Sequence, residues 1–169
     1  LLSADSIAFK PEFSTPKAMG ENDMLEVKTQ FVEATQRAVK AGFDAVELQM
    51  HNGFLLASFL SPLSNQRKDN YGGSIENRAK YPLEVVKAMK DVMGEMPLIV
   101  KLNVTDWHSD GITKEDVEYV EDDSIESDEV EEYTEEVILP DLDDLDDFDN
   151  TEKIDNVLYL KDEIPGYDI

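Results

Sequence analysis

Cysteine is absent from this chain of 169 residues. Disulfide bonds and thiolate-held iron–sulfur clusters are therefore excluded, and the absence is consistent with a reducing compartment. The only two histidines, His51 and His108, fall in separate predicted loops. The acidic run 141–146 lacks the central glycine and the closing glutamate of a calcium loop. The sequence therefore predicts no metal site.

Long apolar runs are missing as well. No stretch approaches the roughly 18 residues that a membrane-spanning helix needs, and the first residues lack the basic and then apolar pattern of a secretory signal. We therefore predict a cytoplasmic protein with no membrane partner. The first residue is leucine rather than methionine, so we expect the chain to be a piece of a longer polypeptide.

Basic residues are scarce, and they are distributed unevenly. Residues 1–112 hold 15 acidic and 12 basic side chains, whereas residues 113–169 hold 24 acidic and 3 basic ones, which together make the net charge of −24. A field of this sign repels nucleic acid backbones within about 8 to 10 Å at physiological salt. Nucleic acid is therefore not an expected partner.

The first part of the chain alternates between helical and strand-like patterns. Residues 21–41 carry an apolar stripe at helical spacing, followed by a glycine suited to a C-cap, and residues 43–48 are a short apolar run typical of a buried parallel strand. Residues 54–60 predict one or two helical turns. The stripe of the first helix consists of Met24, Val27, Phe31, Ala34 and Ala38.

The alternation then repeats once. Residues 75–93 predict a helix, in which Pro82 indicates a kink or a late start, and residues 97–102 predict a second apolar strand. A third helix is expected to begin near Thr113. This order indicates a parallel α/β fold, although composition does not separate a (β/α)₈ barrel from an open sheet.

The acidic part has no sustained period. Its isolated apolar residues bury too little surface to offset the entropy of ordering, so we predict that residues 113–169 are mostly disordered. Residues 157–160 (Val-Leu-Tyr-Leu) form the one run there that could make a strand. Two regions are thus predicted, divided after residue 112.

Residues 61–78, Ser-Pro-Leu-Ser-Asn-Gln-Arg-Lys-Asp-Asn-Tyr-Gly-Gly-Ser-Ile-Glu-Asn-Arg, form what we call the signature loop. This stretch resembles the corresponding loop of the old yellow enzyme family of NADH:flavin oxidoreductases. The resemblance covers about residues 1–112 and implies the central segment of a TIM barrel, around its fourth and fifth strands. It also implies FMN as cofactor and NAD(P)H as reductant.

The resemblance further implies site residues after the fourth strand. The family has a His-x-x-His or His-x-x-Asn pair there, which hydrogen-bonds the substrate oxygen, and Gln49 and Asn52 occupy the two positions here. Both retain an amide donor for an oxyanion. His51 lies between them as a third candidate, with a role as an ordinary loop histidine left open.

Two further positions differ from the family pattern. Phe54 replaces a tyrosine that gives a proton to the substrate, so the acceptor would need another acid or no such proton, and a simple packing role is the alternative. Lys101 replaces an arginine near the flavin N1 and C2 carbonyl, where a cation stabilises the reduced cofactor. The alternative is a strand-end lysine that reaches solvent.

Three interpretations remain open at this stage. The first is a fragment of an FMN-dependent oxidoreductase that passes hydride from NAD(P)H to an enone, quinone or similar acceptor, and that is inactive without a complementing chain. The second is a noncatalytic derivative whose acidic tail binds a basic protein. The third is an aberrant product whose tail has no selected role.

Overall fold

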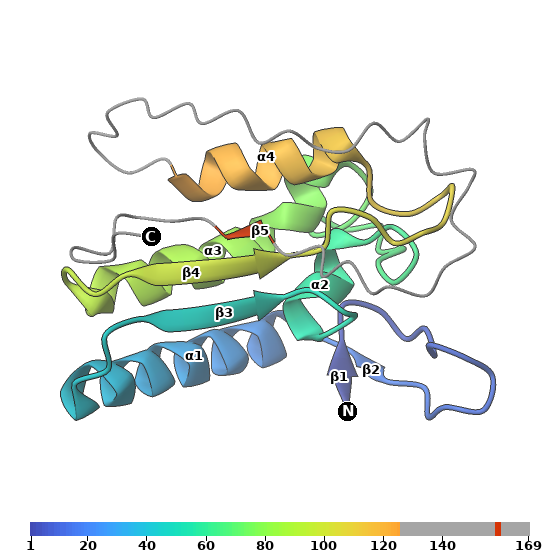
Figure 1. Cartoon of the computed structure of the whole chain (residues 1–169). Coiled ribbons are helices and arrows are strands. Elements are labelled where there is room, and N and C mark those ends of the chain that lie inside the picture. Colours follow the sequence, from blue (N-terminus) through green and yellow to red (C-terminus); the bar gives the residue numbers. More distant parts are fainter. Residues whose placement is uncertain (126–157, 160–169) are drawn as a thin grey trace.

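Two parallel strands, β3 (Val46–Met50) and β4 (Leu98–Leu102), lie at the centre of the structure (Figure 1). The computed structural model of the chain describes residues 1–125 and 158–159. The two strands pair in register along their whole length, and α3 (Ile75–Met93) connects them as the helix of a βαβ crossover. This confirms the α/β class and the helix predicted over residues 75–93.

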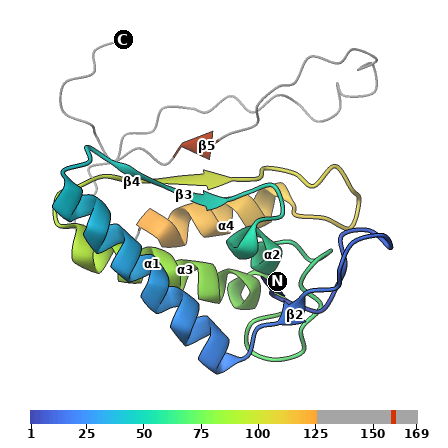
Figure 2. The same ribbon diagram turned by 90° about the horizontal axis from the view of Figure 1, so that it is seen from below.

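The helices gather on one face of this sheet (Figure 2). α1 (Glu21–Ala41) and α4 (Lys114–Ile125) both pack against α3, and the short α2 (Leu55–Leu60) packs between α3 and β3. The bounds of α1 match the helix predicted from its apolar stripe. Its C-cap is Gly42, whose φ of 77° is left-handed and whose N–H donates to the carbonyl oxygen of Val39 at 3.0 Å.

Side chains alternate between the two faces of the sheet. Leu48 and Val100 are buried beneath the helices, whereas Gln49 is exposed and Lys101 is only partly buried. Because successive side chains of a strand point to opposite sides, Gln49 and Lys101 lie on the face that the helices leave uncovered. In a (β/α)₈ barrel the helices surround the outside, so this uncovered face corresponds to the barrel interior.

Within the described residues the sheet is open, whereas the sheet of a parallel barrel closes on itself. β5 (Leu158–Tyr159) pairs with β4 in the antiparallel sense, and β3 has no second neighbour within the described residues. A separate two-stranded sheet is formed by β1 (Leu2–Ser3) and β2 (Lys17–Ala18). Residues 1–125 and 158–159 therefore do not close a barrel. The disorder predicted for the acidic tail concerns mainly residues 126–157 and 160–169, which lie outside the described part.

Two details depart from the sequence-based expectations. β3 starts at Val46 rather than at residue 43, because Phe43 still hydrogen-bonds back to the carbonyl oxygen of Ala38 at 3.3 Å and completes the end of α1. Pro82 does not delay the start of α3, which runs through it. α4 begins at Lys114, in agreement with the third helix expected near Thr113, and it buries Val117 and Val120.

Candidate functional site

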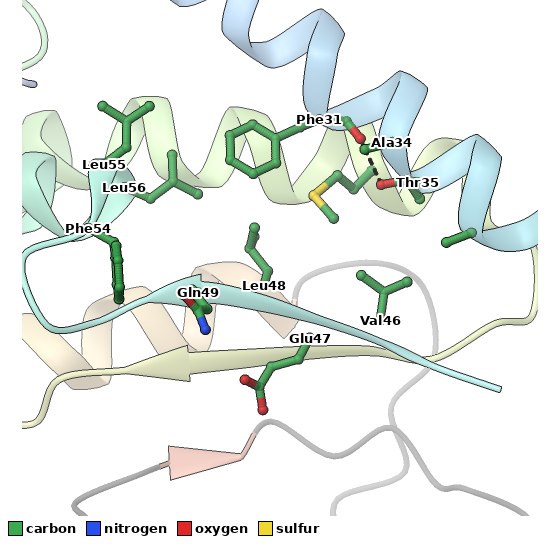
Figure 3. A pocket seen from close by; sticks show the side chains of 12 residues that line it. Phe31, Ala34, Thr35, Val46, Glu47, Leu48, Gln49, Phe54, Leu55 and Leu56 are labelled. Carbon is green, nitrogen blue, oxygen red and sulfur yellow. Dashed lines mark hydrogen bonds between the residues drawn. The ribbon is translucent and has the colours of Figure 1, made fainter. Parts of the chain in front are cut away.

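Gln49 and Lys101 are neighbours on the uncovered face of the sheet. They are partners in the β3–β4 register, and Figure 3 shows the Gln49 side chain directed away from the helices, opposite to Leu48. The structure thus places an amide donor beside a cation on adjacent strands. Such a pair can bind a group that carries or develops negative charge.

Asn52 lies just beyond the end of β3, in a left-handed backbone conformation with φ of 51°. Its backbone N–H donates to the side-chain oxygen Oδ1 of Asn103 at 3.0 Å, which joins the carboxyl ends of β3 and β4. Asn52 is exposed, so its side-chain amide remains available at the same end of the sheet as Gln49. The structure therefore brings both predicted oxyanion donors to one end of two neighbouring strands.

His51 has a different environment from Gln49 and Asn52. It is buried, and its ring contacts that of Phe54 edge-on, with ring centroids 5.9 Å apart. Its Nε2 atom has no hydrogen-bond partner within the described part of the chain. β3 ends at Met50, so the alternation of strand side chains does not extend to His51. Phe54 itself is about half exposed at the start of α2.

Two residues that sequence reasoning missed organise the loop after β4. Asn103 receives the Asn52 N–H, and Asp106 accepts hydrogen bonds at Oδ2 from the hydroxyl of Ser61 at 2.6 Å and from the N–H of Ile112 at 3.0 Å. A sequence signal for both residues exists, because they are polar and follow directly after an apolar parallel strand. In a barrel, that end of the strands carries the active site.

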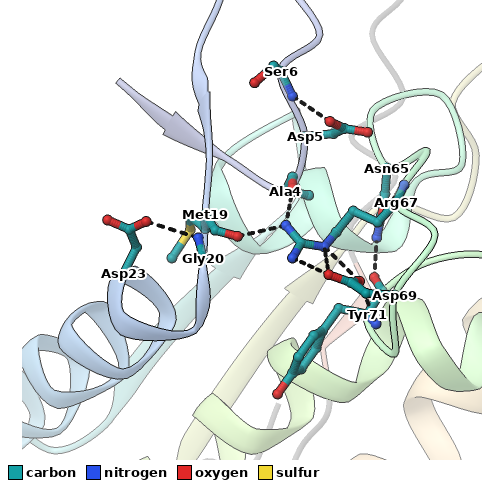
Figure 4. Close-up of polar contacts among 10 residues, drawn as sticks. All are labelled: Ala4, Asp5, Ser6, Met19, Gly20, Asp23, Asn65, Arg67, Asp69 and Tyr71. Carbon is teal, nitrogen blue, oxygen red and sulfur yellow. Dashed lines mark hydrogen bonds and ion pairs between the residues drawn. The ribbon is translucent and has the colours of Figure 1, made fainter.

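The signature loop is held by Arg67 (Figure 4). Its Nη1 atom donates to the carbonyl oxygens of Ala4 and Met19, both at 2.7 Å, and its Nε atom donates to Asp69 at 3.0 Å. The hydrogen bond from Arg67 lowers the pKa of Asp69 below its ordinary value. Any Cβ atom at Gly72 would collide with the backbone of Arg67, so the loop requires a glycine there.

Arg78, at the end of the signature loop, connects α3 to α4. Its guanidinium is buried and its Nη2 atom donates to Oδ1 of Asp116 at 2.7 Å, whereas Nε and Nη1 have no partner among the described residues. The loop is thus tied to the N-terminal segment by Arg67 and to α4 by Arg78. Both ties stabilise the loop beside the carboxyl ends of the strands.

The donor set on the uncovered face is suited to one edge of a flavin. A flavin ring gains negative charge at N1 and its C2 carbonyl on reduction, and Lys101 with Gln49 offers a cation and an amide donor side by side. A barrel usually holds its phosphate by loops after the seventh and eighth strands, whereas the described chain contributes two consecutive parallel strands. The residues therefore suit part of a flavin site.

No group of three or more potential metal ligands occurs among the described residues. None of the helices in the same part of the chain combines the length and the apolar character needed to cross a bilayer.

Comparison with known proteins identifies relatives of this chain. NADPH dehydrogenase of Geobacillus thermodenitrificans is 41% identical over 121 residues, which are 71% of this chain and 35% of that protein. An NADH:flavin oxidoreductase of Gibberella zeae is 45% identical over 93 residues, 54% of this chain and 22% of that protein. The chain thus spans about a third or less of the length of these relatives.

Solved structures show the same partial correspondence. A variant of morphinone reductase in complex with tetrahydroNAD superposes with a TM-score of 0.64 at 30% identity, over 73% of this chain and 39% of that one. The complex of 2-naphthoyl-CoA reductase with 2-naphthoyl-CoA superposes with a TM-score of 0.68 at 28% identity, over 73% of this chain and 19% of that one.

The model of one protein family matches most of the sequence. The match covers residues 3–152 and extends past the end of the resemblance seen in the sequence, near residue 112. FMN and NAD(P)H are the cofactor and the reductant that this family implies. The chain belongs to the NADH:flavin oxidoreductase / NADH oxidase family.

Proposed function

We propose that this chain supplies the fourth-strand and fifth-strand sector of an FMN-dependent NAD(P)H oxidoreductase that reduces an enone, a quinone or a similar small acceptor. The observation that carries the proposal is the register pairing of Gln49 with Lys101 on the uncovered face of the sheet. Bound FMN would supply the hydride transfer from reduced nicotinamide to the acceptor.

The residues of the chain have separate roles in this proposal. The amides of Gln49 and Asn52 donate hydrogen bonds to the acceptor oxygen and stabilise the charge that develops there. Lys101 stabilises negative charge on the edge of the cofactor. His51 is buried against Phe54, so it contributes by holding the turn that carries Asn52 rather than by touching the acceptor.

The nature of the acceptor follows from Phe54. Phenylalanine has no proton to donate, and its ring stands exposed beside the site. Acceptors that need no proton from the protein at carbon, such as quinones, are therefore favoured over enones. The two parallel strands of the described sheet do not surround a cofactor, so the proposal requires the remaining strands of a barrel.

A chimera tests the proposal directly. The segment of Geobacillus thermodenitrificans NADPH dehydrogenase that matches this chain is replaced by the 121 residues of this chain that align with it. Flavin absorbance is recorded after desalting, together with NADPH-dependent quinone reduction. We expect bound flavin and turnover, and we expect Lys101→Met to lower kcat/KM by about tenfold or more, since one charge interaction near the flavin is worth about 1.4 kcal/mol or more.

Two controls accompany this experiment. Lys40→Met, on the exposed end of α1, removes the same charge far from the site and should leave kcat/KM unchanged. A folded chimera without flavin, beside a parent that binds it, would contradict the proposal. The 169-residue chain alone should remain colourless after desalting.

A second candidate function is favoured by β5. The antiparallel pairing of Leu158–Tyr159 occupies the edge of β4 at which an all-parallel barrel would add its next strand. This supports a noncatalytic derivative that binds a basic protein through its acidic tail. The test is retention of a basic protein by the immobilised chain, before and after Leu142, Leu145 and Phe148 are changed to alanine. Retention that these changes abolish would support this candidate. Retention that they leave unaffected would exclude apolar anchoring.

A further inference from the structure

Asn52 is followed directly by Gly53, and no other asparagine of the sequence precedes a glycine. An Asn-Gly pair favours one reaction of the backbone, because glycine has no side chain that shields its own nitrogen. That nitrogen attacks the side-chain Cγ atom of the asparagine and closes a succinimide ring. The sequence thus supplies the reacting pair, and the local structure decides how readily the two atoms meet.

Asn52 and Gly53 are the central residues of a β-turn at the carboxyl end of β3. The N–H of Phe54 donates to the carbonyl oxygen of His51 at 3.1 Å, and the φ angles of Asn52 and Gly53 are 51° and 69°. A turn in which both central φ angles are positive is of type I′. Its first central residue has a ψ of about +30°, which directs the next backbone nitrogen away from Cβ. The closed turn therefore separates the Gly53 nitrogen from the Asn52 Cγ atom.

The turn is exposed, and it is held at both of its ends. Asn52 and Gly53 are both exposed, so water reaches the carboxamide. Besides the bond between Phe54 and His51, the N–H of Asn52 donates to Oδ1 of Asn103 at 3.0 Å. Asn103 follows β4, so this second bond fixes the turn to the neighbouring strand. Any motion that brings the Gly53 nitrogen to the Asn52 Cγ atom has to work against these two bonds.

We propose that Asn52 is a site of spontaneous deamidation that reacts when this turn opens, and that Asn103 slows the reaction by holding the turn closed. In the open turn a bond forms between the Gly53 nitrogen and the Asn52 Cγ atom. The bond from Cγ to Nδ2 breaks, and the amide leaves as ammonia with the proton of the Gly53 N–H. Water then opens the ring at either carbonyl and leaves an aspartate or an isoaspartate at position 52. No oxidant or reductant takes part.

The product has the opposite hydrogen-bonding character. An ionised carboxylate accepts hydrogen bonds and donates none, whereas the carboxamide of Asn52 donates. A negative charge at this position also repels an oxyanion. Deamidation would therefore remove one of the two proposed donors to the acceptor. This consequence rests on the proposed function, whereas the reaction itself does not.

Other asparagines of the chain serve as internal references. Asn70 is exposed like Asn52 but precedes Tyr71, whose side chain hinders the backbone nitrogen. Asn65 is buried, and its amide donates to the carbonyl oxygens of Phe59 and Tyr71, both at 2.7 Å. We therefore expect Asn52 to react before Asn70, and Asn70 before Asn65.

The test follows deamidation in the full 169-residue chain. The chain is incubated in mildly alkaline buffer, with and without concentrated urea, and digested at intervals. Mass spectrometry then measures deamidation at each asparagine, and an isoaspartate assay identifies the rearranged product. We expect the product at position 52 to appear first, and to form faster in urea, where the turn is open.

Substitution of Asn103 tests the protection. Asn103→Ala should speed the reaction at Asn52 in the folded chain by about twofold to tenfold, the factor by which the net loss of one hydrogen bond shifts a local opening equilibrium. Thr105→Ala is the matched control, since it removes a side-chain acceptor of the same loop, which receives the N–H of Trp107 at 3.0 Å. Its effect on Asn52 should be less than about twofold.

Three results would overturn the proposal. These are an Asn52 that stays intact while Asn70 reacts, a rate at Asn52 that urea does not raise, and an Asn103→Ala variant that reacts no faster than Thr105→Ala. If Asn103→Ala fails to fold, the comparison of the unsubstituted chain with and without urea still decides whether the turn protects Asn52. No flavin, nicotinamide or acceptor is added, so these rates are independent of the flavin and turnover measurements that test the proposed function.

Discussion

The side chain of Asn103 accepts a hydrogen bond from the backbone N–H of Asn52 at 3.0 Å. The two residues are 51 positions apart in sequence, at the carboxyl ends of β4 and β3. Asn52 has a positive φ of 51°, which is unfavourable for most residues other than glycine and tolerated by asparagine. Asn103 therefore holds a proposed oxyanion donor in a backbone conformation that the local sequence alone favours only weakly.

Substitution of Asn103 tests this role. Asn103→Ala removes the acceptor, and we expect the free energy of unfolding to fall by about 0.5–1.5 kcal/mol, the range for one partly exposed hydrogen bond. Urea denaturation followed by circular dichroism measures the change. Asn70→Ala, at an exposed asparagine of the signature loop, should change the free energy by less than about 0.5 kcal/mol. Equal effects of the two substitutions would contradict a specific role for Asn103.

Arg67 is expected to be a principal tie of the N-terminal segment. Arg67→Ala removes two hydrogen bonds to the carbonyl oxygens of Ala4 and Met19, and we expect a loss of about 2 kcal/mol or more, because bonds from a charged donor are worth about 1.5–3 kcal/mol each. Hydrogen exchange should accelerate over residues 1–19. Lys68→Ala, at the exposed neighbouring position, serves as control, and equal acceleration in both variants would refute the assignment.

The lowered pKa of Asp69 predicts that the stability of the fold depends on pH. Its pKa is lowered in the folded chain, first by the hydrogen bond from Arg67, from an ordinary value of 3.8. A lowered pKa stabilises the fold above the ordinary value, and this contribution is lost as the pH falls through the folded pKa. The stability difference between the unsubstituted chain and Asp69→Asn should therefore be constant from pH 7 to about pH 5 and shrink below about pH 4. Denaturant titrations across this range measure it, and a difference that grows in acid would contradict the sign.

The buried ion pair between Arg78 and Asp116 should be far more sensitive to substitution than an exposed one. Asp116→Ala leaves a guanidinium that is 5% exposed without its counter-charge, and we expect a loss of about 3–5 kcal/mol in the free energy of unfolding. Lys114→Ala breaks the exposed pair with Glu118 on the same helix and should cost less than about 1 kcal/mol. Thermal unfolding of the two variants compares them, and similar melting temperatures would rule out a structural role for the buried pair.

Local patterns in the sequence predicted most of the elements. The bounds of α1 and α3 follow from the helical spacing of their apolar residues and from the glycines that end them, and both were confirmed. The run Val157 to Leu160 predicted a strand, and β5 lies within it. These features are encoded by neighbouring residues, because a helix stripe and a C-cap involve contacts only a few positions apart. The signature loop likewise identified the family without any structure.

The site was only partly accessible to the same reasoning. Gln49, Asn52 and Lys101 were found by resemblance, and their roles remain predictions. The burial of His51 against Phe54 and the contact between Asn103 and Asn52 were not foreseen, because each depends on how a chain reversal places side chains that no periodic pattern describes.

The sequence by itself determined the helices, the parallel order of β3 and β4, and membership of a flavin oxidoreductase family. Only the tertiary structure decided that Gln49 and Lys101 share the uncovered face and that β5 pairs with β4 in the antiparallel sense. It also decided that β3, among the described residues, pairs with β4 alone. The physical reason is that strand pairing joins residues distant in sequence. Each strand pairs with a surface whose shape and polarity are built from several segments of the chain, so no single segment of the sequence specifies the pairing.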